Sequence, residues 1–196
     1  MSKKLAIIFV FIFFYSCNQE KEAEYLTLAK EFQYKMNIEF ADKKSTPLTD
    51  KDFIKFSSLK YFPIQKKYRI KAKFKRTPNE KPFDMLTTTS RLAKYVKYGI
   101  ATFTLDGKKL HLAIYQNVKG EKHLFLPFFD KTNNKTSYSG GRYMDLENPT
   151  NDTIILDFNQ SYNPYCAYNY KYSCPIPPDE NRLNIEINAG VLKWEH

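Results

Sequence analysis

The spacing of apolar residues changes from helix-like to strand-like near residue 68. Between residues 20 and 37, apolar side chains recur at steps of three and four residues, which places them on one stripe of an amphipathic helix. The stripe consists of Tyr25, Leu28, Ala29, Phe32 and Met36. A second, short helix is predicted where Thr49 precedes Asp52 by three residues, a capping-box pattern, ahead of two phenylalanines. Both helices are expected to serve as packing elements.

From Tyr68 onward, apolar and polar residues alternate, which predicts strands with one buried and one exposed face. In residues 68–75, the apolar set alternates with arginine and lysines. Two further alternating runs, 101–105 and 108–115, flank Asp106-Gly107, the signature of a hairpin with a type I′ turn. Additional strands are predicted at 83–89, 92–98, 123–128, 153–158 and 183–188.

About seven short strands joined by short loops predict a mainly β (α+β) fold. We expect an antiparallel sheet curled into a barrel or sandwich, with one or two N-terminal helices packed against it. The helix–strand alternation that a parallel sheet would need is absent. No linker divides the chain, so residues 25–196 are predicted to form a single domain.

The N-terminus has the pattern of an export signal. Two lysines precede an apolar run from Leu5 to Tyr15, which is too short to cross a bilayer as a helix. A serine and Cys17 follow, and cysteine in this position resembles a bacterial lipoprotein signal. We therefore expect a signal peptide at 1–16, a lipid on Cys17 and a tether at 17–24. An uncleaved anchor and ordinary secretory cleavage are the alternatives.

This reading places the protein in the cell envelope, anchored to a lipid bilayer and facing the periplasm or located at the outer membrane. The chain has 31 Lys and Arg against 21 Asp and Glu, a net charge of +10. Outside the cytoplasm, such a charge is suited to anionic lipid or acidic glycans. Because the lysines are scattered, a solvated basic surface explains them equally well. We expect no nucleic-acid partner and no cofactor.

Residues 157–182 have an unusual composition, with two cysteines, four prolines, five tyrosines and four asparagines. Proline restricts the backbone, and tyrosine combines an apolar ring with a polar tip, so this segment is predicted to be a rigid, partly buried loop that binds ligand. Upstream, a glycine pair before Arg142 can present its guanidinium to a carboxylate or phosphate, or the arginine can pair inside the fold. Asp157 and Asn159 can bind a ligand or cap a turn. The ligand-binding candidates are Arg142, Tyr143, Asp145, Asp157, Asn159, Tyr162, Asn163, Cys166, Tyr168, Cys174, Glu180, Asn181 and Arg182.

Cys166 and Cys174 form an even pair in a predicted exported domain. The first interpretation is a disulfide closing a nine-residue loop, worth about 2–3 kcal/mol. No metal site is expected, since the spacing is not that of a zinc knuckle and the histidines of the strands lie far upstream. Cys166 as a nucleophile would need a nearby base. Asp157 and Glu180 offer a pair of carboxylates for acid–base chemistry.

A series of short motifs runs through most of the chain. They are Phe62-Pro63 ahead of Tyr68-Arg69, Thr87 to Thr89, Phe103 to Gly107, Leu126 to Phe128 with Asp130, Gly140 to Tyr143 with Asp145, Asp157 to Asn159, Tyr162 to Pro164, Cys166-Ala167, Cys174-Pro175, Pro177-Pro178, Glu180 to Leu183 and Ala189-Gly190. Over residues 45–193, this series closely resembles the short form of the bacterial domain of unknown function 1684 family. The resemblance implies no activity, because the family has no established function.

Three functions therefore remain open on the sequence. The first is a lipid-anchored binding protein that takes a small polar ligand or glycan through the 157–182 loop and Arg142. The second is a cell-envelope hydrolase that uses Asp157 and Glu180, or Cys166. The third is a structural or interaction protein, in which the polar groups of the loop are consumed inside the fold. Burial of Arg142 and of the tyrosine hydroxyls would favour the third.

Overall fold

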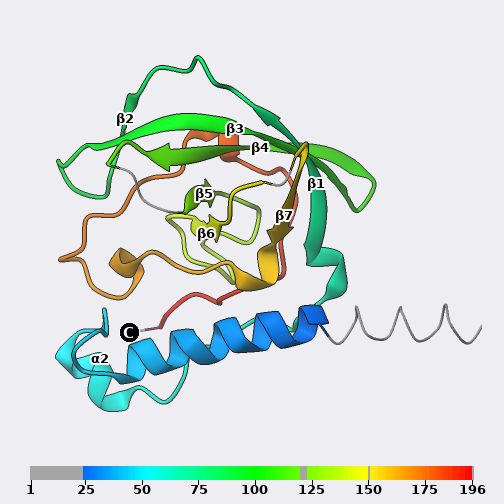
Figure 1. Ribbon diagram of the computed structural model, residues 1–196. Coiled ribbons are helices and arrows are strands. Elements are labelled where there is room, and N and C mark those ends of the chain that lie inside the picture. Colours follow the sequence, from blue (N-terminus) through cyan, green and yellow to red (C-terminus); the bar gives the residue numbers. More distant parts are fainter. Residues whose placement is uncertain (1–23, 120–122, 150, 196) are drawn as a thin grey trace, which may run out of the picture.

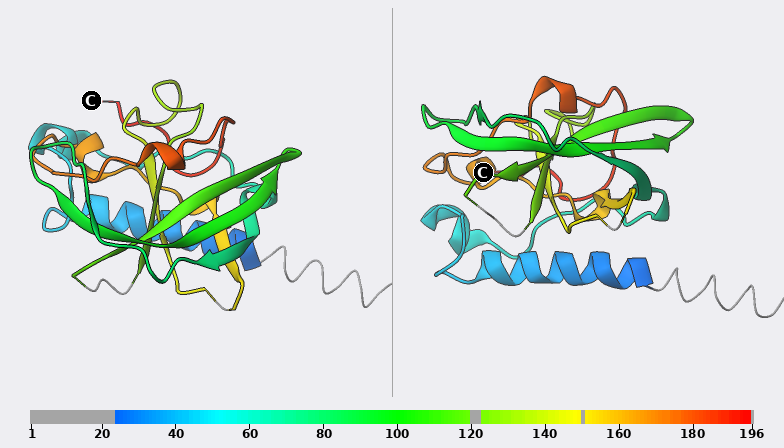
Figure 2. Two further views of the ribbon diagram at one scale, coloured as in Figure 1. Left: turned by 90° about the horizontal axis from the view of Figure 1, so that it is seen from above. Right: turned by 45° about the horizontal axis from the view of Figure 1, so that its top comes forward.

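The computed structural model describes residues 24–119, 123–149 and 151–195. The predicted signal peptide, Cys17 and nearly all of the tether lie outside these residues. An antiparallel sheet of seven strands forms the body of the domain, in the order β6-β5-β4-β3-β1-β7 with β2 beside β3. The strands are β1 (Arg69–Arg76), β2 (Phe83–Met85), β3 (Ala93–Leu105), β4 (Lys108–Asn117), β5 (Leu124–Phe128), β6 (Arg142–Leu146) and β7 (Thr153–Asp157). The sheet curls into a half-barrel, which confirms the predicted fold class (Figures 1 and 2).

The β3–β4 hairpin forms where the sequence predicts it. Leu105 pairs with Lys108, and Asp106 and Gly107 both have positive φ, at 47° and 74°, as a type I′ turn requires. The separate strand predicted at 92–98 is wrong, because β3 continues through it to the hairpin. Its register shifts between Lys97 and Gly99, so a bulge bends the strand where two strands were expected.

Two other strand predictions need correction. The predicted strand at 183–188 does not form, although every second residue there, Leu183, Ile185 and Ile187, is buried. This segment instead hydrogen-bonds to the chain after β5: Leu183 donates to Phe129 O (2.8 Å), and Lys131 donates to Ile185 O (2.8 Å). Conversely, β6 was not predicted, because Arg142, its first residue, was interpreted as part of a turn that follows the glycine pair. The turn itself is real, because Gly141 has a φ of 87°.

Helices cover one side of the half-barrel. Residues 24–41 are helical, four residues beyond the predicted end, because Phe40 extends the apolar stripe and is fully buried. The short helix α2 (Asp50–Lys55) begins as predicted, with Thr49 accepting from the Asp52 amide at 3.1 Å. Single turns of 3₁₀ helix occur at η1 (Lys66–Tyr68), η2 (Phe158–Gln160), η3 (Tyr165–Ala167) and η4 (Asp179–Asn181). Among the described residues, none of these helices is long and apolar enough to cross a membrane.

The main core fills the inside of the curled sheet. It is formed by inward-facing residues of β1, β3, β4, β5, β6 and β7, together with residues 183–189. Phe74 and Ala101 are buried while their neighbours along the strands are exposed or half-buried, as the alternation predicts. A second apolar cluster around Phe40 and Tyr168 joins the N-terminal helix to η3. The 157–182 segment is therefore held between the sheet and the helices.

Candidate functional site

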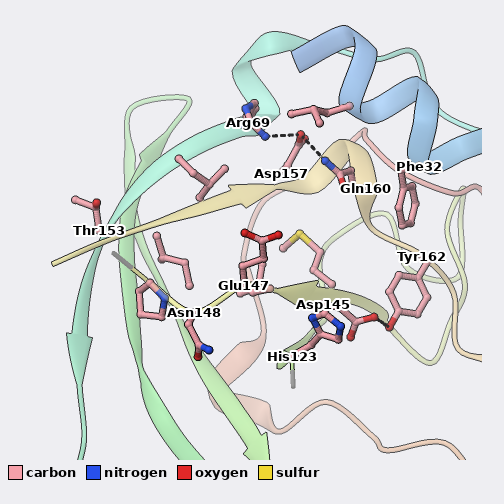
Figure 3. Close-up of a pocket in the computed structure, with 16 residues that line it drawn as sticks. Phe32, Arg69, His123, Asp145, Glu147, Asn148, Thr153, Asp157, Gln160 and Tyr162 are labelled. Atoms are coloured by element: carbon pink, nitrogen blue, oxygen red, sulfur yellow. Dashed lines mark hydrogen bonds and ion pairs between the residues drawn. The ribbon is translucent and has the colours of Figure 1, made fainter. Parts of the chain in front are cut away.

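The half-barrel is open between β6 and β7, the two edge strands of the sheet. A cavity of about 530 Å³ lies along this opening, bordered by β6, β7 and the N-terminal helix (Figure 3). This volume is in the range of small-molecule sites. We call the cavity the seam pocket. Its polar lining residues are Arg69, His123, Asp145, Glu147, Asn148, Thr153, Asp157, Gln160 and Tyr162.

Asp157 organises one end of the seam pocket. Its Oδ2 accepts from Arg69 Nη1 at 3.2 Å and from Gln160 Nε2 at 3.1 Å. Its Oδ1 accepts from the Asn159 backbone N–H at 3.1 Å and from Asn159 Nδ2 at 2.8 Å. Arg69 and Asp157 meet because they are cross-strand partners on β1 and β7. Asp157 is buried, whereas Arg69 is half-buried and lines the pocket. This end therefore combines a held carboxylate with a guanidinium within reach of a ligand.

Tyr162 and Asp145 form the other end. The Tyr162 hydroxyl donates to Asp145 Oδ2 at 2.8 Å, and its ring contacts those of Phe32 and Tyr143 at centroid distances of 6.4 and 5.9 Å. Partial loss of water raises the pKa of Asp145, although the residue as a whole is exposed, while the Tyr162 hydrogen bond and nearby His123 oppose this rise. Burial, reinforced by the Asp145 charge, raises the pKa of Tyr162 well above its ordinary value. Tyr162 therefore stays a neutral donor.

The charge of the seam pocket is opposite to that of the whole protein. Three carboxylates, of Asp145, Glu147 and Asp157, face one guanidinium, that of Arg69. Glu147 is exposed at the pocket, and within the described part of the chain its carboxylate has no hydrogen bond or ion pair (Figure 3). A cationic or hydroxyl-rich ligand is therefore favoured over an anionic one.

Arg142 lies in the interior and not at the pocket, which corrects the expectation that it contacts ligand. Its side chain is 0% exposed. The guanidinium donates to Asp130 Oδ2 (2.7 Å), to Ile187 O (2.8 Å) and to Ala189 O. Desolvation lowers the pKa of Arg142, against the opposing effect of Asp130. Arg142 therefore ties the C-terminal segment to β6 and stabilises the fold.

Three predicted asparagines are also buried and used internally. Asn159 bonds both backbone groups of Gln65 at 3.0 Å, and Asn163 donates to Leu192 O at 2.9 Å. Asn181 accepts from the Ala113 amide (2.7 Å) and donates to two carbonyls, so it joins β4 to β5 where their pairing is limited to Tyr115 and Phe125. These side chains replace backbone hydrogen bonds and do not reach the seam pocket.

The two cysteines are thiols in this structure, and both are buried. The Cys166 amide donates to Cys174 Sγ at 3.2 Å, and the Tyr138 hydroxyl lies 3.8 Å from Cys166 Sγ. The hydrogen bond between the thiols, followed by those from Tyr138 and Thr88, lowers the pKa of Cys166 to about 6, although burial opposes this. The same bond raises the pKa of Cys174. Within the described residues no histidine contacts Cys166, so a base for a cysteine nucleophile is missing.

The remaining candidates lie at other places. Glu180 accepts from Lys97 Nζ and from the Tyr115 hydroxyl, both at 2.7 Å, and does not line the seam pocket, so the structure does not bring it to Asp157. Arg182 pairs with Asp179 at 3.1 Å on the surface. The Tyr143 hydroxyl donates to a backbone carbonyl, and Tyr168 is packed in the helix cluster.

The pocket therefore gathers three of the predicted residues, Asp145, Asp157 and Tyr162. Sequence reasoning missed Arg69, Gln160 and the apolar wall contributed by the helix. The alternation of β1 did place Arg69 on the exposed face, but its register with β7 was not readable. In the part of the chain that the structure describes, no three His, Cys, Asp or Glu side chains gather as a metal site would require.

Comparisons with known proteins agree with this fold. The family model described as "Protein of unknown function (DUF1684)" matches residues 54–192. The solution NMR structure of an uncharacterized protein of Haloarcula marismortui superposes with a TM-score of 0.72 at 32% sequence identity, covering 88% of this chain and 96% of that one. No curated protein matches the chain.

Proposed function

The chain belongs to the DUF1684 family of proteins of unknown function, and from that premise we propose that it is a binding protein whose seam pocket takes a small, polar, uncharged or cationic ligand. The observation that carries the proposal is the pocket itself. Its two ends are fixed by hydrogen-bonded pairs, Arg69 with Asp157 and Tyr162 with Asp145, across an apolar wall that includes Leu28 and Phe32. Convergent polar groups on an apolar wall are the usual composition of a ligand site.

Three features support binding over hydrolysis. The carboxylates predicted to act as acid and base, Asp157 and Glu180, are engaged by different partners at different places. The Asp157 carboxylate already accepts four hydrogen bonds, from Arg69, from Gln160 and from the backbone and side-chain amides of Asn159. Cys166 is buried beside Cys174, away from the pocket lining. Arg142 and Tyr143 are used inside the fold, as the structural alternative expects of them. Asp145, Asp157 and Tyr162 face the pocket instead, and these side chains are suited to orienting a ligand.

The test is a series of NMR titrations of the isotope-labelled whole chain with three probes: N-acetylglucosamine, lysine amide and citrate. We expect the neutral or the cationic probe to shift the amide signals of Gln160 and Tyr162, and citrate to leave them unchanged. Substituting Asp145→Asn should weaken the interaction. The exposed carboxylate of Asp179 lies outside the pocket, so Asp179→Asn is the matched control. If none of the probes moves a pocket signal, the proposal is overturned.

We propose in addition that Cys17 carries a lipid that holds this binding domain at a membrane of the cell envelope. Support comes only from the sequence at 1–17, which lies outside the described residues. Metabolic labelling with an alkyne fatty acid should tag the chain in cells, and Cys17→Ser should remove the tag. A label that persists in the variant would contradict the proposal.

A further inference from the structure

The edge strand β7 leaves backbone groups unpaired on the side that faces the seam pocket. The amide of Phe74 donates to the carbonyl of Asp152 at 2.7 Å, so Asp152 and every second residue after it direct their backbone groups toward β1. Ile155 belongs to the alternate set. Its N–H and C=O therefore point away from β1 and into the seam, and its side chain, 41% exposed, lines the pocket.

The opposite edge, β6, has the same property. Tyr143 exchanges two backbone hydrogen bonds with Tyr162, of 2.9 and 3.0 Å, on the side of β6 away from β5. Asp145, two residues along, directs its backbone groups to that same side. No backbone hydrogen bond of the described residues crosses the seam at Asp145 or Ile155. Unpaired strand edges of this kind are templates for another strand.

The side chains along the two edges separate into a buried set and an exposed set. Met144, Leu146 and Ile154 are buried on the core side of the seam, whereas Asp145 and Ile155 are exposed on the outer side. Glu147, exposed just after β6, adds a second carboxylate to the pocket, with no partner among the described residues (Figure 3). A strand lying in the seam would therefore direct every second side chain toward buried apolar atoms and the others toward the exposed side, where Ile155 lies with the carboxylates of Asp145 and Glu147.

We propose that the ligand of the seam pocket is an extended peptide segment of alternating apolar and basic residues, which pairs with the free edge of β7. This rests on the proposed function and names the class of ligand. The peptide backbone bonds the N–H and C=O of Ile155, its apolar side chains enter beside Met144 and Leu146, and its basic side chains reach Asp145 and Glu147. Backbone pairing supplies affinity in this mode of recognition, and the alternate side chains supply specificity.

A suitable probe is a synthetic peptide with the sequence of Arg69–Arg76, which alternates apolar and basic residues. Added to the isotope-labelled whole chain, it should shift the amide signals of Asp145 and Ile155. It should also slow hydrogen exchange of the Ile155 amide roughly tenfold or more. The same peptide with glutamate in place of each lysine should bind at least about tenfold more weakly, because it meets the pocket carboxylates with like charge.

Two variants of this chain separate backbone pairing from side-chain contact. Ile155→Pro removes an N–H that β1 does not use, a change that edge strands tolerate, and it should lose peptide binding. Ile155→Ala keeps the N–H and should retain most of the affinity. If Ile155→Pro does not fold, a peptide methylated on its backbone nitrogens provides the same test with the unchanged protein, and it should fail to bind.

The outcomes distinguish this inference from the proposed function. If lysine amide or N-acetylglucosamine shifts pocket signals but the peptide does not, the pocket binds ligand and the peptide inference is overturned. Equal affinity for the lysine and glutamate peptides, or binding that leaves Ile155 exchange unchanged, overturns it as well. If no probe moves any pocket signal, both fail.

Discussion

Arg142 Nη2 donates to Asp130 Oδ2 at 2.7 Å, and neither side chain is exposed to solvent. Asp130 also accepts through Oδ1 from the amides of Thr132 (2.8 Å) and Ile187 (3.2 Å). The pair is thus the centre of a buried network that joins the segment after β5, the start of β6 and the C-terminal segment. A buried charge without its partner is costly, so the two residues depend on each other.

Breaking this pair should strongly destabilise the domain. We expect Arg142→Met or Asp130→Asn alone to lower the free energy of unfolding by about 3–5 kcal/mol, as found for buried pairs that lose one partner. Chemical unfolding with urea measures the change. Removal of the exposed pair between Arg182 and Asp179 by Arg182→Ala is the control, with an expected effect of at most about 1 kcal/mol. Equal losses of unfolding free energy in Arg142→Met and Arg182→Ala would show that the buried pair stabilises the domain no more than the exposed pair does.

Asn181 should be nearly as important, for a different reason. Its amide makes three hydrogen bonds, to both backbone groups of Ala113 and to Pro127 O, with lengths of 2.7–2.8 Å. Asn181→Ala would leave several buried backbone groups unsatisfied, at about 1–3 kcal/mol each. We expect a loss of at least roughly 3 kcal/mol in unfolding free energy. Asn148→Ala, at the exposed pocket rim, should change stability by less than about 0.5 kcal/mol. A small effect at Asn181 would mean that water replaces its amide.

The contacts of the cysteine pair allow it to close as a disulfide in an oxidising compartment. Exported Cys17→Ser protein, unfolded and alkylated without reduction, should carry no label on Cys166 or Cys174. Reduction should then lower stability by about 2–3 kcal/mol, the expected value for a short loop. Cys166→Ser provides the control, since it leaves one thiol to be labelled. Two labels on the unreduced protein would show that the thiols stay free.

In the reduced protein, Cys166 should titrate below an ordinary thiol. The hydrogen bond with Cys174 lowers the pKa of Cys166 to about 6. Because the folded-state value is depressed, this ionisation adds stability that is fully present above the unfolded thiol pKa and is lost as the pH falls through about 6. Thiolate absorbance should therefore rise with a midpoint near pH 6, and Cys174→Ala should move that midpoint upward. A midpoint near the ordinary thiol value would show that burial dominates.

The elements that the sequence predicted well are those set by local chemistry. Asp106-Gly107 predicts its own turn, and the alternation in β1 predicts which side chains are buried. The prediction of a strand at 183–188 was wrong because alternation indicates only that every second residue is buried. A segment can bury every second residue without pairing with a neighbouring strand. The register of β3 shifts beside Gly99, where a side chain would clash with the ring of Phe74 across the sheet, and local patterning does not report either feature.

The site was harder to predict because it arises where the sheet fails to close. The unusual 157–182 segment does contribute Asp157, Gln160 and Tyr162 to the pocket. However, most of its polar groups satisfy the backbone inside the fold, as Asn163 and Asn181 do. Composition identifies a segment rich in polar side chains. It cannot distinguish the side chains that hydrogen-bond inside the fold from those that face the pocket. The register of β7 and the curvature of the sheet make that distinction.

Asp145 should show a conflict between stability and binding. Partial burial raises its pKa, so its ionised form opposes folding: the contribution to stability is present below the unfolded carboxyl pKa and is lost as pH rises through the folded value. Asp145→Asn should therefore increase the free energy of unfolding at neutral pH, by at most about 1 kcal/mol because the residue is exposed. The same substitution should weaken binding of the Arg69–Arg76 peptide. Urea unfolding across a pH series measures the change in unfolding free energy, and the gain should vanish in acid.

Tyr162→Phe tests the role of the Asp145 carboxylate by removing its hydrogen-bond donor. Its hydroxyl bond to Asp145 lowers the pKa of that carboxyl against the effect of burial. Without the hydroxyl, the pKa of Asp145 should rise further, as an NMR titration of its carboxyl carbon would measure. Binding of the lysine peptide should then weaken at a higher pH on acidification than in the unchanged protein. If the pKa of Asp145 rises but the pH dependence of binding stays the same, Asp145 is not the carboxylate that the peptide contacts, and Glu147 becomes the residue to substitute.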